Sequence, residues 1–593
     1  MVAIEMSPTS PQAKTDHNFS LAWESLTYTV KSKGAQKALI SDLHGMLSPG
    51  SALAVMGPSG CGKTTLLNIL ADRIKISNAI SGQIYVNGKP RSSSKFRNIS
   101  SYVAQSDSLM DIFTVRETIS FAASLSYPFF MKGKDKKQKV DELAAEMGIS
   151  GCMDARVGGN LFKGISGGQM KRLSVALSLI SNPYILLLDE PTSGLDSAAT
   201  MGVMGHIQSL TKQGRTIIYS IHQPSSEVFQ SFDLLCLLSR GECIYYGKAD
   251  QAVAFFSGLN YKCPQYSNPA DYFLTVINTD FEGHGDVEAI VKSFKDGQQM
   301  KQLKEGIEKD KASGKADSSS TEIRKFQANW LVQFLFLTKR NMINSVINPG
   351  IYWVRIVMYF MLCLMMGTMY LKTNEDITED MLIPLLFYCQ AFLVFMSVAV
   401  LPFFMLQQPV FVRERSNGLV DVFPFVFSNF VSALPGILLI TVLSTVMVIF
   451  MTDLDGFWGF FVNLFLSLVC AESLMHVLSA STPHYIIGIA LGAGFFGMFM
   501  LAEGFMVPKD AIPPWWIWAH YIAFHSYSFR SFMYNQWGDK NDLAAVSIKT
   551  QYPVIADMDE DDFRNDMFIL MGYGCGLQIV FFLIIYFFHT GRQ

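Results

Sequence analysis

The sequence predicts an α/β domain in the first half of the chain and an all-α membrane domain with six helices in the second. Two observations support this division. Up to about residue 320 the charged residues are scattered throughout, as in a soluble α/β protein. Beyond that point they thin out inside apolar runs of about 20 residues, the length that crosses a bilayer. A chain of 593 residues also exceeds one ordinary domain.

The overall composition argues against several classes of protein. Hydrophobic residues make up 50% and aromatic residues 13%, which is ordinary for a soluble domain fused to membrane helices. No basic patch with interleaved aromatic residues is evident, so we expect no nucleic-acid partner. Residues 1–17 lack the apolar run of a signal peptide, so we expect the first half to stay in the cytosol. The nine cysteines form no CxxC pair, and we interpret them as reduced thiols.

A glycine-rich turn connects a predicted strand, residues 51–56, to a predicted helix. This context is typical of a loop whose backbone N–H groups close around phosphate oxygens. Lys63 supplies a positive charge for the β- and γ-phosphates, and the Thr64 hydroxyl is a ligand for Mg²⁺, so the turn predicts ATP and Mg²⁺ as cofactors. The alternative is a turn without a ligand. The predicted nucleotide-binding residues of the turn are Gly57, Pro58, Ser59, Gly60, Cys61, Gly62, Lys63, Thr64 and Thr65.

Two further apolar strands end in polar residues. Residues 185–188 precede Asp189, which is placed to orient Mg²⁺ through its water shell, and Glu190, which is placed to take a proton from attacking water. The strand that begins at Thr216 ends at His222, which can hydrogen-bond the γ-phosphate. The alternative for His222 is a structural role at the end of a strand.

A third motif follows the phosphate-binding turn by about a hundred residues and opens a helix. It consists of Ser166, Gly167, Gly168 and Gln169. The Ser166 side chain and the following amides form an anion site at the start of this helix. The order and spacing of all these motifs resemble those of the ATP-binding cassette family. The resemblance implies that the Ser166 turn faces the γ-phosphate bound by a partner cassette, so that a dimer is required.

The same resemblance assigns two more residues of the cassette. Gln105 matches the family's Q-loop, which senses Mg²⁺ and touches the membrane domain, and Asp196 matches the D-loop. Residues 114–118, 164–168 and 268–273 resemble the G subfamily, the half-transporters of the White type. In that branch the cassette precedes the membrane domain, as it does here. One departure is Gln169 followed by Met170, where the branch usually shows Glu and Arg.

The predicted domain boundaries follow the composition. The cassette covers residues 1–282, a polar and flexible linker residues 283–325, and an amphipathic connecting helix residues 326–350. The membrane domain covers residues 351–593, with a large outer loop at 506–566. The predicted spans are 351–371, 382–406, 430–451, 457–480, 485–505 and 567–588.

The charge bias of the first two loops predicts the orientation. Arg413 and Arg415 follow the second span, whereas the loop after the first span is acidic, so we expect the Arg413 loop, the cassette and both termini to be cytosolic. The subfamily resemblance implies that residues 408–415 form a short loop that docks on the cassette. It also implies that residues 508–537 form a re-entrant segment.

Ionisable residues inside the spans are costly and therefore informative. Glu472 and His476 are four residues apart on one helix face and are expected to hydrogen-bond each other, either as a packing pair or as part of a conformational relay. Glu503 ends the fifth span. The resemblance implies a central cavity, with Phe395 in its wall and Phe505 and Met506 in an apolar plug above it.

These features together predict a half-transporter of the G subfamily, a multi-pass protein of the plasma membrane surrounded by membrane lipids. It is expected to form a homodimer with a second copy of itself, or a heterodimer with a related half-transporter. The expected function is ATP-driven export of hydrophobic or amphipathic molecules such as lipids, sterols or xenobiotics, because the predicted cavity is apolar. The alternatives are an ATP-gated channel and a regulatory membrane ATPase that transports nothing.

Overall fold

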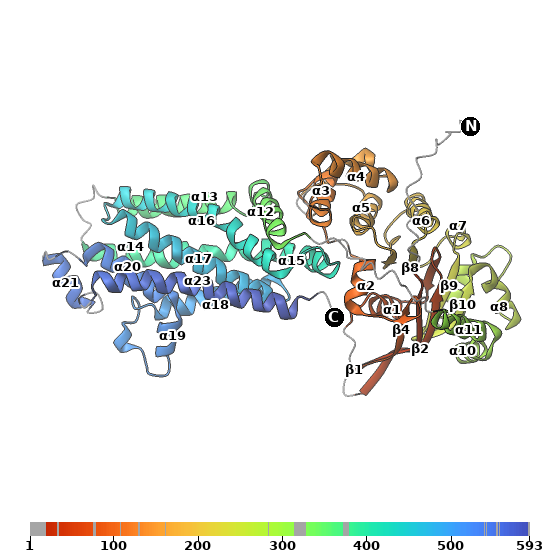
Figure 1. Cartoon of the computed structure of the whole chain (residues 1–593). Coiled ribbons are helices and arrows are strands. Elements are labelled where there is room, and N and C mark those ends of the chain that lie inside the picture. The colour runs from red at the N-terminus through yellow and green to blue at the C-terminus, as the bar shows by residue number, and fades with distance from the viewer. Residues whose placement is uncertain are drawn as a thin grey trace. The chain divides into compact units, whose positions relative to one another are not determined.

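The structure is a computed structural model of the chain and consists of two compact units. It describes residues 19–32, 35–74, 79–106, 108–128, 131–159, 162–280, 282, 284–313, 328–371, 379–538, 540, 543–552, 556 and 558–590. The first unit contains residues 1–107 and 113–326, and the second contains residues 108–112 and 327–591 (Figure 1).

The first unit is built on a six-stranded sheet with the strand order β10-β9-β3-β8-β7-β6. Five of these strands are parallel, and β10 runs antiparallel to β9. Strands β3, β7 and β8 are buried throughout, which explains their uninterrupted apolar sequences. The strands are β3 (Ala52–Met56), β6 (Ser100–Val103), β7 (Ile185–Leu188), β8 (Thr216–Ser220), β9 (Leu234–Ser239) and β10 (Glu242–Lys248).

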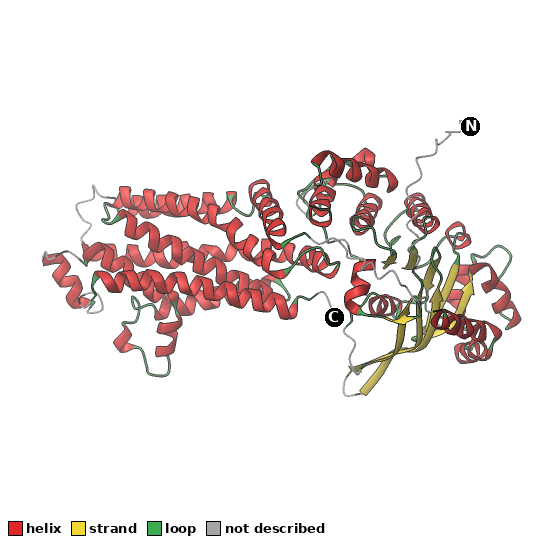
Figure 2. Ribbon diagram, in the orientation of Figure 1, coloured by secondary structure: helices red, strands yellow, loops and turns green. Residues whose placement is uncertain are grey.

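A second, antiparallel sheet has the order β2-β1-β4-β5. Trp23 of β1 is fully buried and packs edge-on against Tyr246 of β10, so the two sheets share one hydrophobic core. Figure 2 shows both sheets in yellow, with helices beside them. The strands are β1 (Leu21–Ser32), β2 (Ala35–Leu47), β4 (Ile80–Val86) and β5 (Lys89–Pro90).

Helices surround the main sheet and connect its strands. Helix α1 begins at Lys63, directly after the turn that follows β3, and α5 begins one residue after Ser166. The helices are α1 (Lys63–Leu70), α2 (Ser93–Ile99), α3 (Val115–Ser126), α4 (Gly133–Glu146), α5 (Gly167–Leu179), α6 (Ser197–Lys212), α7 (Ser226–Gln230), α8 (Ala252–Gly258) and α9 (Pro269–Ile277).

The expected flexible linker is wrong for residues 287–312. This stretch forms two helices, α10 (Val287–Asp296) and α11 (Gln298–Ala312), which pack on β10 and β2. The physical reason is a narrow apolar stripe inside a polar sequence. Ile290 and Phe294 of α10 and Ile307 of α11 are each at most 1% exposed, so each helix buries one face despite its many charges. Residues 283 and 314–325 of the expected linker lie outside the described residues.

The described part of the second unit is helical (Figure 2). By length and composition, five of its described helical segments can cross a membrane, namely 382–416, 422–452, 457–481, 485–502 and 560–588. The segment Trp353–Met369 is apolar but has only 17 residues, or about 25 Å at 1.5 Å per residue. Each of the six predicted spans overlaps one of these segments.

Helix α17 lies at the centre of the second unit and contacts α15, α16, α18, α20 and α23. The helices are α12 (Trp330–Ile347), α13 (Trp353–Met369), α14 (Leu382–Tyr388), α15 (Leu401–Ser416), α16 (Val422–Thr452), α17 (Phe457–Ser481), α18 (Tyr485–Ala502), α19 (Ile517–Ile522), α20 (Phe524–Trp537), α21 (Leu543–Gln551) and α23 (Glu560–Phe588).

The expected loop at residues 408–415 is wrong, because this segment belongs to α15. The subfamily resemblance implied a loop here, but the Glu414 carboxylate is buried. It accepts hydrogen bonds of 2.6 and 3.1 Å from the Arg340 guanidinium of α12. Arg413 and Arg415 lie in the last turn of α15, where positive charges stabilise a helix.

Candidate nucleotide site

The turn after β3 has the geometry of a phosphate-binding loop. Gly60 and Gly62 have φ angles of +76° and +108°, a region that favours glycine. The Lys63 ammonium donates hydrogen bonds to the carbonyl oxygens of Gly57 (2.7 Å) and Pro58 (3.0 Å), so the loop holds its own cation in place. Burial raises the pKa of the Cys61 thiol, which therefore adds no negative charge to the loop.

A pocket of about 240 Å³ opens beside this loop. It is lined by Leu39, Ser59, Gly60, Gly62, Lys63, Thr64, Thr65 and Glu190. The structure therefore brings Glu190 to the phosphate-binding turn, although more than a hundred residues separate them in the sequence. His222 reaches the same turn, since its Nε2 lies 3.3 Å from the Ser59 hydroxyl.

Asp189 is 2% exposed and accepts three hydrogen bonds at the end of β7. The donors are the hydroxyls of Ser220 (2.6 Å), Tyr102 (3.2 Å) and Thr64 (3.3 Å). Burial and the neighbouring Asp189 raise the pKa of Tyr102, so its phenol keeps the proton that it donates. Three donors on one carboxylate fix the orientation of the Asp189 side chain.

Sequence reasoning missed Tyr102 and Ser220, although a signal was available. Tyr102 lies in β6 and Ser220 ends β8, the two parallel neighbours of β7. The Ser220 hydroxyl also accepts a hydrogen bond of 2.8 Å from the backbone N–H of Glu190. A hydroxyl near the carboxyl end of a strand beside Asp189 is the pattern that would have predicted both residues.

Glu190 is held in an uncommon conformation. Its φ angle is +47°, in the left-handed region that non-glycine residues rarely adopt. Gln105 donates a hydrogen bond of 2.7 Å from its side-chain amide to the Glu190 carboxylate, and the Gln105 backbone carbonyl accepts one from the Lys171 ammonium of α5. Gln105 lies two residues beyond the end of β6, and Glu190 lies two residues beyond the end of β7. Their side chains are thus in direct contact.

The Ser166–Gln169 motif and Asp196 each cap a helix. Ser166 and Gln169 form a reciprocal capping box at the start of α5: the Ser166 hydroxyl accepts from the Gln169 backbone N–H (3.3 Å), and the Gln169 side chain accepts from the Ser166 backbone N–H (3.0 Å). Asp196 caps α6 through Ala199 at 2.7 Å. The lining of the 240 Å³ pocket includes neither Ser166, Gly167, Gly168, Gln169 nor Asp196, so one copy of the chain does not bring the two motifs to one pocket.

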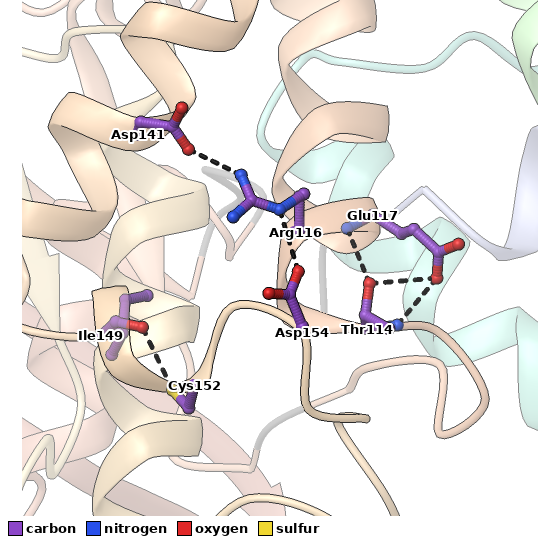
Figure 3. Close-up of polar contacts among 7 residues, drawn as sticks. All are labelled: Thr114, Arg116, Glu117, Asp141, Ile149, Cys152 and Asp154. Carbon is purple, nitrogen blue, oxygen red and sulfur yellow. Dashed lines mark hydrogen bonds and ion pairs between the residues drawn. The ribbon is translucent and has the colours of Figure 1, made fainter.

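In the first unit, helix α3 contacts both α4 and α5, and Arg116 of α3 forms ion pairs that connect α3 to α4. Its guanidinium contacts Asp141 of α4 (2.7 Å) and Asp154 of the following turn (3.1 Å), and Thr114 and Glu117 form a capping box at the start of α3 (Figure 3). Because Arg116 and both acids are solvent-exposed, we ascribe orientation rather than much stability to these ion pairs. Helix α3 packs on α5, the helix that Ser166 caps.

The donor set of the pocket fits Mg²⁺. The Thr64 hydroxyl and the Asp189 carboxylate lie 3.3 Å apart beside the phosphate-binding loop, and both present the hard oxygen atoms that Mg²⁺ prefers. Mg²⁺ usually keeps several waters and binds one or two protein oxygens together with substrate phosphates. The residues that the structure describes hold no cluster of three or more His, Cys, Asp or Glu suited to a metal ion.

The expected hydrogen bond between Glu472 and His476 is wrong. The Glu472 carboxylate instead accepts a hydrogen bond of 3.1 Å from the Arg355 guanidinium of α13, and both side chains are buried. His476 lies 3.4 Å from the Gln578 amide of α23. Arg355 has a full charge, which makes it the stronger partner for a carboxylate in an apolar environment. Arg355 lies inside the first predicted span and was overlooked in the sequence.

The residues predicted for the cargo cavity lie in different surroundings. Phe395 packs beside Phe496 of α18, with ring centroids 6.1 Å apart. Phe505 stacks on Phe387 of α14 at 4.4 Å. Met506 is 58% exposed.

Three family models match this chain, two of them almost entirely within the first unit and one within the second. The family model described as "ABC transporter" matches residues 40–193, and two described as "ABC-2 type transporter" match residues 222–290 and 332–537. "ABC transporter G family member 1" of Petunia hybrida is 35% identical and covers 90% of this chain and 86% of its own.

Two further relatives extend over similar lengths. "ABC transporter G family member 11" of Arabidopsis thaliana is 36% identical and covers 90% of this chain and 79% of its own. "Broad substrate specificity ATP-binding cassette transporter ABCG2" of Rattus norvegicus is 32% identical and covers 87% of this chain and 84% of its own.

Proposed function

Because this chain belongs to the ABC transporter G family and is an ATP-driven membrane transporter, we propose that it exports hydrophobic or amphipathic molecules as a homodimer. The observation that carries the proposal is the pocket in which Lys63, Thr64 and Glu190 meet, in a chain whose second unit consists of apolar helices. A dimer of two identical chains would contain two such pockets.

We assign the steps of ATP hydrolysis to named residues. Lys63 neutralises the phosphate oxygens, and Glu190 takes a proton from the attacking water. His222 reaches the γ-phosphate from the end of β8, on the same side as Ser59. Bound Mg²⁺ would supply charge neutralisation between the phosphates, and Thr64, Asp189 and Gln105 are the residues that would hold it or its waters.

The second copy of the chain would complete each site. Ser166 and the first amides of α5 form an anion site that is absent from the pocket of its own chain. We infer that this site faces the γ-phosphate held by the partner, with Gly167, Gly168, Gln169 and Asp196 beside it. Two ATP molecules would then hold the cassettes together until hydrolysis releases them.

The proposal also includes the direction of transport and the chemical class of the cargo. We place the cassettes and both termini in the cytosol, because Arg413 and Arg415 lie at the end of α15, and we place the protein in the plasma membrane. Phe395, Phe505 and Met506 would line or close a cavity between the two copies. Such an apolar surface favours sterols, phospholipids or planar dyes over ions and sugars.

Uptake into sealed inside-out vesicles tests this proposal. Labelled sterol, phospholipid and a planar dye would be supplied outside with ATP and Mg²⁺, and vesicles holding the Glu190→Gln variant would serve as the control. We expect ATP-dependent accumulation of at least one probe, and only with the unchanged protein. ATP-dependent ionic currents without accumulation would indicate a gated channel, and hydrolysis without either would indicate a regulatory ATPase.

A further inference from the structure

A pocket of about 280 Å³ lies where helix α18 ends, within the second unit. Glu503 follows the last residue of α18, and its side chain lines this pocket. The residue is only 2% exposed, and neither of its carboxylate oxygens has a hydrogen-bond partner among the described residues. An ionised carboxylate buried in this way is strongly destabilised unless it gains a proton or a cation.

The C-terminal end of α18 also favours a positive charge in this pocket. The C-terminus of a helix carries a partial negative charge, and Glu503 adds a carboxylate at that point. Nδ1 of His520 lies 2.7 Å from the carbonyl oxygen of Ala502. Nδ1 must be the protonated nitrogen there, so in the neutral ring Nε2 is a second acceptor beside the pocket.

The charged residues already in the lining do not supply the missing cation. Arg530 lines the pocket but donates to the Asp566 carboxylate from both Nε, at 2.7 Å, and Nη2. The Lys509 ammonium lies over the ring of Tyr521, 5.3 Å from its centroid, and is followed by the exposed acid Asp510. Neither cation forms an ion pair with Glu503.

The remaining walls suit an organic body rather than a hydrated metal ion. Tyr521, Tyr527, Phe529 and Tyr552 contribute aromatic rings, and the apolar part of the lining exceeds the polar part. The ring faces in this pocket already bind cations, since the Arg530 guanidinium lies 5.6 Å from the ring centroid of Tyr527. An acidic group at one end and aromatic walls around it are the features that recognise a protonated amine on an apolar body.

We propose that the pocket beneath Glu503 binds an amphipathic organic amine, whose ammonium group pairs with the Glu503 carboxylate while its apolar body packs against the tyrosine and phenylalanine rings. The volume suits a small ligand of roughly a dozen non-hydrogen atoms. This site goes beyond the proposed function, since it lies within one copy of the chain and needs neither ATP nor a partner subunit.

Calorimetric binding to the full-length protein in lipid nanodiscs tests the proposal without ATP. The probes are 2-(1-naphthyl)ethylamine and 2-(1-naphthyl)ethanol, which have the same body and differ in charge. We expect the unchanged protein to bind the amine about tenfold more tightly than the alcohol, the magnitude of one charge-assisted hydrogen bond. Glu503→Gln should remove this preference, whereas Asp510→Asn, an exposed acid of the same lining, should keep it.

Equal binding of the two probes to the unchanged protein would overturn the proposal, as would an amine preference that survives Glu503→Gln. If that variant does not assemble, Tyr521→Ala replaces it, because Tyr521 is 55% exposed and its truncation spares the core. This variant should weaken the amine and the alcohol alike, and unchanged amine binding would contradict the assigned wall. Loss of transport with intact amine binding would count against the proposed function alone.

Discussion

The side-chain amide of Gln105 donates a hydrogen bond of 2.7 Å to the carboxylate of Glu190. The two residues follow β6 and β7, which are parallel neighbours, so the sheet itself brings them together. Lys171 of α5 holds the backbone carbonyl of Gln105. A continuous chain of contacts therefore runs from the proposed general base to the helix that Ser166 caps.

Replacing Glu190 by Gln should separate ATP binding from hydrolysis. Glutamine has the same shape and can still accept the hydrogen bond from Gln105, but it cannot take a proton from water. We expect hydrolysis to fall by about a hundredfold or more, with ATP binding retained. Phosphate release and nucleotide binding by the purified protein measure the two effects. Glu227→Gln, an exposed acid of α7, is the control, and near-normal turnover of Glu190→Gln would refute the assignment.

Lys63→Met should weaken ATP binding itself. The Lys63 ammonium is the charge that the loop holds in place through two backbone carbonyls, and methionine fills similar space without that charge. We expect the affinity for ATP to fall at least tenfold, because a charge-assisted contact to the phosphates is lost. Equilibrium binding of a fluorescent ATP analogue measures it. The exposed Lys212→Met is the matched control, and unchanged affinity in Lys63→Met would remove Lys63 from the site.

Ser220→Ala should raise the Mg²⁺ concentration that hydrolysis requires. The Ser220 hydroxyl donates to the Asp189 carboxylate at 2.6 Å and accepts from the Glu190 backbone N–H at 2.8 Å, so its loss frees the Asp189 carboxylate and the Glu190 backbone to shift. We expect the half-maximal Mg²⁺ concentration to rise several-fold, about the effect of one hydrogen bond. Titration of ATPase activity with Mg²⁺ checks this. Ser220→Thr should restore most of the affinity for Mg²⁺. An identical Mg²⁺ dependence of ATPase activity in Ser220→Ala and in the unchanged protein would contradict the role of Ser220 in positioning Asp189.

The sequence revealed the parts of the site that lie in continuous motifs. Lys63, Thr64, Asp189 and Glu190 could be predicted because each follows a buried strand, and parallel strands bring such positions to one edge of a sheet. Ser220 could not be predicted with the same ease. Its hydroxyl near the carboxyl end of a strand is a signal only once β8 is known to lie beside β7, and that strand order is not part of a short motif.

The membrane unit shows the same limit. The apolar runs predicted its helices, because length and composition decide which segments suit a bilayer. The pairing of Arg355 with Glu472 joins residues that are 117 positions apart, and only the tertiary fold, in which α13 and α17 both pack on α16, brings them together. A local rule, four residues along one helix, favoured His476 instead. Similarly, α10 was missed because only Ile290, Phe294 and a few neighbours are apolar in a polar stretch.

The Arg355–Glu472 pair predicts an asymmetry between single and double substitutions. Arg355→Ala leaves the Glu472 carboxylate buried without its partner, which costs about 3–5 kcal/mol. Replacing both residues by methionine removes both charges and fills the space, so we expect it to cost less. Thermal unfolding in detergent measures the two. Arg564→Ala breaks an exposed pair with Asp561 and should change nothing, and a double variant less stable than Arg355→Ala would contradict the account.

The central claim of this account is that two copies of the chain complete each other's ATP sites. Nucleotide trapping in mixed dimers tests it most directly, with Lys63→Met on one copy and Ser166→Arg on the other, or both changes on the same copy. If Ser166 acts across the dimer, the first arrangement concentrates the damage in one site and leaves the other intact. The second arrangement damages both. We therefore predict trapping of labelled nucleotide at one site in the first dimer and little in the second. Equal trapping in the two arrangements, or full-rate hydrolysis by isolated monomers, would contradict the claim.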